Sequence, residues 1–96
     1  MGAFEDDMQY GIKLERQEKL ALEFHEEFLR ARKKFLPMAS AHEGIAVIEE
    51  EYLELRAIVY QKQSVRDYAK MRKEVIQLGA MALAFLIEIV ETENRR

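Results

Sequence analysis

The sequence contains no cysteine and no tryptophan, and it has only one proline and four glycines among its 96 residues. Without cysteine the chain cannot form a disulfide, a thiolate nucleophile or a zinc–thiolate cluster, which fits a reducing compartment. The shortage of proline and glycine disfavours a β fold, because such folds place these residues at their many turns. We therefore expect long helices and no sheet.

The charge and hydropathy of the sequence argue against binding to nucleic-acid polymers or membranes. Acidic residues outnumber basic ones by 18 to 15, and no basic block is long enough to bind a nucleic-acid polymer. The acidic first ten residues do not resemble a secretory signal. The longest uninterrupted apolar run, residues 78–87, has ten residues, whereas a membrane span needs about 20. We expect a cytoplasmic protein that binds neither membranes nor nucleic-acid polymers.

Three helical segments follow from the spacing of apolar residues at intervals of three and four. The first spans residues 11–36 and ends before Pro37. The second begins after Ser40, and the third runs from a turn at residues 61–64 to about Glu93. The pattern predicts one domain over residues 1–96, in which residues 1–10 form a loose arm or a short helix. The expected fold class is all-α, an antiparallel bundle of three main helices.

Two pairs of residues carry the spacing of a helix N-cap. Ser40 and Glu43 form a capping-box pattern, in which the serine oxygen accepts the third helical amide and the glutamate reaches back. Ser64 and Asp67 repeat this spacing with a shorter carboxylate before the third helix. We expect these pairs to begin the second and third helices.

The second helix carries two lines of residues. Its main apolar stripe is expected to form the core, and it comprises Ile45, Ile48, Tyr52, Leu55 and Val59. A neighbouring line contains two carboxylates between apolar ends, and it comprises Val47, Glu51, Glu54 and Ile58. Carboxylates within such a line are less easily explained as a solvated face than an isolated glutamate such as Glu49.

The third helix is apolar on nearly every side. Between Val75 and Val90 only Gln77 and Glu88 are strongly polar. A helix of this kind must be buried nearly all round, and two further helices of one small chain can hardly enclose it. The simplest explanation is that homo-oligomerisation completes the bundle, as a homodimer or a homotetramer.

Glutamates on the second and third helices form a candidate metal site. Glu50, Glu51 and Glu54 have the arrangement EExxE, and such close like charges destabilise a helix unless a cation lies among them. Glu74 and Gln77 are three residues apart and therefore share a face of the third helix. If the two helices are antiparallel neighbours, these oxygens can surround Mg²⁺, which prefers hard oxygen ligands. A solvated acidic face is the alternative.

These residues resemble the MazG-like all-α nucleoside triphosphate pyrophosphohydrolases, in particular their small single-domain branch. The resemblance covers residues 40–90. It rests on EExxE at residues 50–54, on Glu74 after a spacer of nineteen residues, and on the apolar helix that follows. The family pattern is EExxE followed by ExxD, so Gln77 stands where the family has aspartate. An amide there carries no charge, which would weaken metal binding or reduce the number of ions.

The resemblance implies a fold, an activity and a site. The fold would be MazG-like, and the protein an obligate dimer or tetramer. The activity would be hydrolysis of a nucleoside triphosphate to the monophosphate and pyrophosphate. Glu50 would orient or deprotonate water as a catalytic residue. The Mg²⁺ ligands would be Glu50, Glu51, Glu54 and Glu74, with Gln77 as an uncharged fifth.

Other residues add a substrate contact and exclude several sites. Lys70 and Lys73 precede Glu74 and could meet phosphate oxygens, although a basic surface turn explains them as well. The Glu-x-x-His motif of di-iron bundles is absent, and so is a glycine-rich phosphate loop. The alternative function is a non-catalytic helical oligomer that binds nucleotides or a partner protein.

Overall fold

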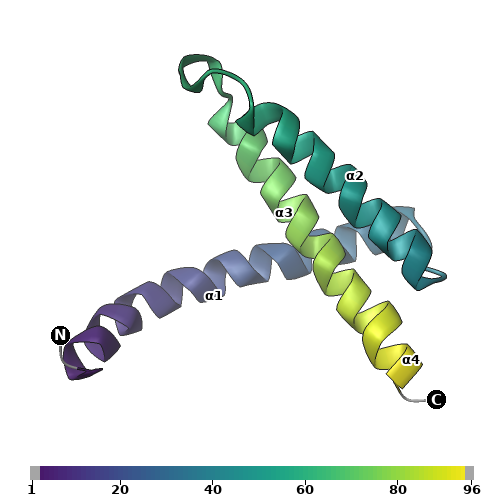
Figure 1. Cartoon of the computed structure of the whole chain (residues 1–96). Helices are drawn as coiled ribbons and strands as arrows, with labels where there is room; N and C mark the ends of the chain where they lie inside the picture. Colours follow the sequence, from purple (N-terminus) through teal and green to yellow (C-terminus); the bar gives the residue numbers. More distant parts are fainter. Residues whose placement is uncertain (1–2, 95–96) are drawn as a thin grey trace.

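The computed structural model describes residues 3–94, and the side chains of residues 14–94. Over this range the chain is helical and contains no strand, which confirms the all-α prediction. The elements are α1 (Ala3–Lys34), α2 (Ala41–Val59), the 3₁₀ turn η1 (Gln63–Val65), α3 (Tyr68–Phe85), the π-helical η2 (Leu86–Glu91) and α4 (Thr92–Asn94). The last three follow one another as a single rod (Figure 1). The three predicted main helices are therefore present.

The helix boundaries differ from the predictions at two places. Helix α1 spans Ala3–Lys34, so residues 3–10, expected as a loose arm or a short helix, continue the first helix, and residues 1 and 2 lie outside the described residues. Asp67 caps α3 by accepting the amide of Lys70 at 3.0 Å, whereas Ser64 lies within η1. The Ser64–Asp67 spacing was therefore a wrong guide, because the aspartate itself is the N-cap. The cap at α2 is as predicted: Ser40 Oγ accepts the amide of Glu43 at 3.1 Å.

Helices α2 and α3 form an antiparallel hairpin, and α1 crosses it with its contacts mainly on α3 (Figure 1). The described chain extends over 45 × 41 × 23 Å and has a radius of gyration of 16.5 Å. A closed domain of this length would have a radius of gyration of about 12.5 Å. The crossing arrangement is therefore open, and no helix of the chain is enclosed by the other two.

Two glycines allow the helices to approach closely at their crossings. A Cβ atom added to Gly79 on α3 would lie 2.4 Å from the ring of Phe24 on α1. A Cβ atom added to Gly44 on α2 would lie 2.6 Å from the ring of Phe85 on α3. Each glycine thus provides space for an aromatic ring from the neighbouring helix, and a larger residue would push the helices apart.

The hairpin packs through the carboxylate-bearing line of α2, which corrects the predicted core stripe. Ile58 on that line is buried, whereas Ile45 and Tyr52 on the predicted main stripe are 53% and 49% exposed. On α3 the facing line likewise contains polar residues and includes the buried Glu74 and Ala84. The physical reason is that the apolar stripe of α2 has no partner within one chain, so periodicity identified an apolar face but not what covers it.

Little of the apolar surface is covered within the chain. The buried apolar residues of the described part are Met38, Ile58, Ala80, Ala84 and Ile89. Seventeen large apolar residues of the described part are more than a third exposed, and they include Leu22 and Leu29 on α1 and Leu36 just beyond its end. Monomeric soluble proteins rarely expose contiguous apolar surface on this scale.

The α3–η2–α4 rod, residues Tyr68–Asn94, is long and apolar enough to cross a membrane when judged by length and composition alone. In the folded chain this rod packs against α1 and α2, where its Glu88 carboxylate binds Arg32 and its Gln77 amide lies against Glu51. Either other helices or lipid could therefore cover the exposed side of this rod. The expectation that the protein does not bind membranes stays a prediction.

An ion pair joins the C-terminal rod to the end of α1. The carboxylate of Glu88 accepts hydrogen bonds from the Nε and an Nη of Arg32. It also accepts one from the backbone amide of Met38, at 3.0 Å. The Arg32 guanidinium in turn lies 5.3 Å above the ring of Phe28. Because Glu88 binds both Arg32 and the Met38 amide, it holds the start of the segment between α1 and α2 against the rod.

Candidate metal centre

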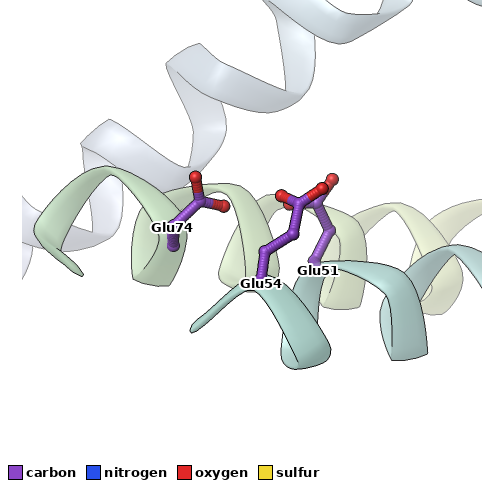
Figure 2. A group of neighbouring side chains, drawn as sticks. All are labelled: Glu51, Glu54 and Glu74. Atoms are coloured by element: carbon purple, nitrogen blue, oxygen red, sulfur yellow. The ribbon is translucent and has the colours of Figure 1, made fainter. Parts of the chain in front are cut away.

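Three glutamates from two helices bring their carboxylates together. Glu51 and Glu54 lie one turn apart on α2, and Glu74 faces them from α3 (Figure 2). One oxygen from each lies within 4.8 Å of the others. The antiparallel hairpin produces this arrangement, because one turn up α2 corresponds to one turn down α3. Of the residues expected to face one another across these helices, Glu50, Glu51 and Glu54 on one side and Glu74 and Gln77 on the other, the structure places carboxylates of Glu51, Glu54 and Glu74 together.

The pKa values of two carboxyl groups show that negative charge is concentrated here. Partial burial raises the pKa of Glu51 to about 7, and the charges of Glu54, Glu74 and Glu50 add to this effect. Burial is also the largest cause of the raised pKa of Glu74. The hydrogen bond with Glu54 and the negative charge of Glu54 raise this pKa further. With a pKa of about 7, Glu51 holds a proton, or exchanges it for another cation, near neutral pH.

Gln77 joins the cluster from the next turn of α3. In the amide orientation that satisfies both neighbours, its nitrogen lies 3.2 Å from Glu51 Oε2 and 3.1 Å from Glu74 Oε2. An aspartate at this position would instead add a further like charge. The amide thus reduces repulsion in the cation-free cluster, and after rotation it can offer an oxygen to a metal.

Glu50 stands apart from these three carboxylates. It is exposed, and it lines the larger cavity beside the cluster. Its charge still raises the pKa of Glu51. Glu49, one residue earlier, is exposed and lines neither cavity described below, as expected for a solvated glutamate. An exposed position beside the cluster suits a group that acts on water more than a primary metal ligand.

The basic residues before Glu74 have different surroundings. The charges of Lys73 and Lys70 both lower the pKa of Glu74, against the stronger effects of burial and Glu54. Lys70 lines the smaller cavity, whereas Lys73 lines neither. Arg72 turns the other way and donates to Glu23 on α1 at 2.9 Å. Of the two predicted phosphate contacts, only Lys70 therefore faces a cavity next to the carboxylates.

Two cavities border the cluster. The larger, of about 800 Å³, lies between the end of α1, the first half of α2 and the middle of α3, and it reaches Glu51 and Gln77. The smaller, of about 400 Å³, lies between the second half of α2 and the start of α3, and it reaches Glu54 and Glu74. The carboxylates therefore line both cavities from the helix faces between them.

Sequence reasoning missed several residues of the larger cavity. Arg30 and Lys34 line it, although the sequence pattern assigned neither residue to a site. Phe35 lines it as well and is 68% exposed. The only signal in the sequence was the proximity of this basic–aromatic segment to Pro37. Its position beside EExxE depends on how α1 crosses the hairpin.

The donor set fits a hard divalent cation. Three carboxylates and one amide provide oxygen ligands on two rigid helices, and burial together with the neighbouring carboxylates raises the pKa of Glu51 to about 7. Mg²⁺ uses one or a few carboxylates and retains water or phosphate oxygens at its other positions. The residues can therefore hold such an ion and leave positions for a phosphate ligand.

Comparison with protein-family models, curated proteins and solved structures finds no match to this chain.

Proposed function

We propose that the protein is a magnesium-dependent nucleoside triphosphate pyrophosphohydrolase that works as a homo-oligomer. The observation that carries this proposal is the set of three carboxylates from two antiparallel helices, Glu51, Glu54 and Glu74, within 4.8 Å of one another. The spacing of EExxE and Glu74, which resembles that of the MazG-like family, adds support.

Each residue has a role that its position supports. Glu51, Glu54 and Glu74 would hold Mg²⁺, and Gln77 would supply a neutral oxygen. When bound, the ion neutralises charge on the phosphate oxygens and makes an associated water more acidic. Glu50, exposed at the edge of the cluster, would orient the attacking water and accept its proton. Lys70 would contact a phosphate oxygen as a point charge.

The exposed apolar stripes support assembly as a dimer or tetramer. Ile45, Tyr52 and Val59 recur every seven residues along the outer side of α2, and they are 53%, 49% and 36% exposed. Such a stripe packs readily against a matching stripe on a second copy. A second copy would also cover the outer side of the C-terminal rod, where Leu86 and Val90 are exposed.

Release of pyrophosphate tests the activity. The purified protein is incubated with Mg²⁺ and a panel of ribo- and deoxyribonucleoside triphosphates, and the nucleotide products are separated by chromatography. We expect the monophosphate and pyrophosphate in equal amounts, and a loss of at least about a hundredfold in Glu51→Gln. Glu49→Gln, an exposed change on the same helix, should retain activity. Absence of hydrolysis with every nucleotide would contradict the proposal.

Gln77 favours a second candidate, a protein that binds nucleotides without hydrolysing them. An amide reduces the charge available to hold metal and polarise the phosphates. Calorimetry with Mg²⁺ and a non-hydrolysable triphosphate separates the two functions. Binding without turnover of the matching natural nucleotide supports the second candidate. Absence of binding contradicts both and leaves a helical oligomer that binds a partner protein.

A further inference from the structure

The two cavities beside the carboxylates differ in chemistry. The larger cavity has apolar walls from three parts of the chain, and they include Phe35 at the end of α1, Met38 and Met81. The smaller cavity has half the volume, and only Ala57 and Ile58 among its lining residues are apolar. An elongated ligand that crosses the carboxylates would therefore meet different surroundings at its two ends.

The larger cavity suits a nucleoside. Its volume of about 800 Å³ lies in the range of small-molecule sites, which combine apolar walls with a few polar groups. Phe35 offers an exposed aromatic ring on which a planar base can stack. Arg30 and Lys34 also line the cavity and can meet the sugar or the nearest phosphate. Arg32, the third basic residue there, is already paired with Glu88.

The smaller cavity suits phosphate groups that carry no base. Lys70 is the cation among its lining residues, and Gln61 adds an amide that can donate hydrogen bonds. Glu54 and Glu74 line the same cavity and would face the phosphates through Mg²⁺. A volume of about 400 Å³ with this lining offers no aromatic surface for a base.

We propose that the substrate lies along the α2–α3 groove in one direction, with its nucleoside in the larger cavity and its two outer phosphates in the smaller cavity beside Lys70. This inference rests on the proposed function. Hydrolysis adds water across the bond between the first two phosphates: one phosphorus gains the water oxygen, the other keeps the bridging oxygen, and a proton is released. The monophosphate therefore leaves from the Phe35 side, and pyrophosphate leaves from the Lys70 side.

Binding of the two products tests the direction without requiring turnover. Calorimetry measures the affinity of magnesium pyrophosphate and of a nucleoside monophosphate for the wild type and for two variants. Lys70→Gln should weaken the binding of magnesium pyrophosphate roughly tenfold or more and should change the affinity for the monophosphate little. Phe35→Ala should weaken the binding of the monophosphate by a similar factor and should change the affinity for pyrophosphate little.

Control variants match each change. Lys62→Gln removes a lysine from the loop before α3, and Tyr60→Ala removes an exposed aromatic ring; neither residue lines either cavity. Both should bind the two products as the wild type does. Circular dichroism of every variant checks that the helices are intact.

The outcomes separate this inference from the proposed function. In the opposite pattern, Lys70→Gln weakens binding of the monophosphate and Phe35→Ala weakens binding of pyrophosphate. That result would overturn the proposed direction of the substrate along the groove. Equal effects of both variants on both products, or no binding of either product to the wild type, would also overturn it. If the products bind with the expected pattern but no triphosphate is hydrolysed, the hydrolase proposal fails while the direction stands.

Discussion

Gln77 on α3 places its amide nitrogen 3.2 Å from Glu51 Oε2 on α2, in the orientation that also brings it 3.1 Å from Glu74. A neutral donor thus lies against two of the three clustered carboxylates. This contact moderates the repulsion between them while no cation is bound. A residue at position 77 that increases the affinity for metal should therefore decrease the stability of the cation-free protein.

Replacing this amide by a carboxylate should shift that balance. We expect Gln77→Asp to lower the Tm of the metal-free protein by several degrees, because it adds a fourth negative charge and removes a donor. The same variant should bind Mg²⁺ roughly tenfold more tightly, since affinity rises with ligand charge. Thermal denaturation with and without Mg²⁺ measures both effects. Gln63→Asp, an exposed change that lines neither cavity, is the control, and an equal gain in that variant would contradict the explanation.

The raised pKa of Glu51 predicts a pH dependence of metal binding. With a pKa of about 7, this carboxyl group holds a proton below neutrality, and Mg²⁺ must displace it. The affinity for Mg²⁺ should therefore rise with pH, by up to about tenfold per pH unit below pH 7, and level off above it. Calorimetry between pH 5.5 and about 8.5 tests this. An affinity independent of pH across this range would contradict it.

The same group predicts how stability changes with pH in the absence of metal. The folded state takes up a proton that the unfolded state releases near pH 4.5, so stability should fall as pH rises from about 4.5 to 7. Glu51→Gln removes this loss, which is on the order of 1 kcal/mol after solvent screening. The variant should therefore exceed the wild type in Tm at pH 8 but not at pH 4, and Glu49→Gln should show no such crossover.

The ion pair between Glu88 and Arg32 should stabilise the fold. Burial raises the pKa of Glu88, but the hydrogen bonds from Arg32 and Met38 and the charge of Arg32 outweigh it and lower that pKa below 4.5. The stabilisation is therefore complete above pH 4.5 and is lost as pH falls through the lower folded value. Glu88→Gln should cost about 1–3 kcal/mol at pH 7, because the half-buried guanidinium loses its partner.

A surface pair on α1 is the comparison for that prediction. Glu27 and Arg30 are 2.9 Å apart, and the arginine is 62% exposed. Such pairs contribute about 0–1 kcal/mol, so Glu27→Gln should change Tm far less than Glu88→Gln. Denaturant unfolding at pH 7 and at about pH 3 compares the two variants. A loss in Glu88→Gln that is as large at the lower pH would rule out the ion pair as its cause.

The outer stripe of α2 predicts how assembly can be broken. Light scattering should give at least twice the chain mass of 11.3 kDa for the wild type. Tyr52→Asp places a charge in the middle of the stripe and should shift the mass toward that of one chain, because an unpaired charge in an apolar interface is costly. Lys62→Asp, in the loop before α3, should leave the mass unchanged. A wild-type monomer would contradict the assembly proposal.

The sequence by itself determined the helices and the neighbours within each of them. Scarce proline and glycine and a repeat of three and four residues predicted three long helices, since helix periodicity is a local property. The cap at Ser40 follows from a local hydrogen bond in the same way. The spacing of Glu51, Glu54 and Glu74 was also sufficient to predict that their carboxylates meet, provided that the hairpin is antiparallel.

Only the tertiary structure decided which face of each helix is covered. The apolar stripe through Tyr52 was expected in the core and is half exposed, whereas the line through Glu51 packs against α3. Periodicity measures how apolar a face is, and it does not identify the surface that meets it. The positions of Phe35 and Lys34 beside the carboxylates likewise depend on how α1 crosses the hairpin at Gly79, a contact between residues far apart in the sequence.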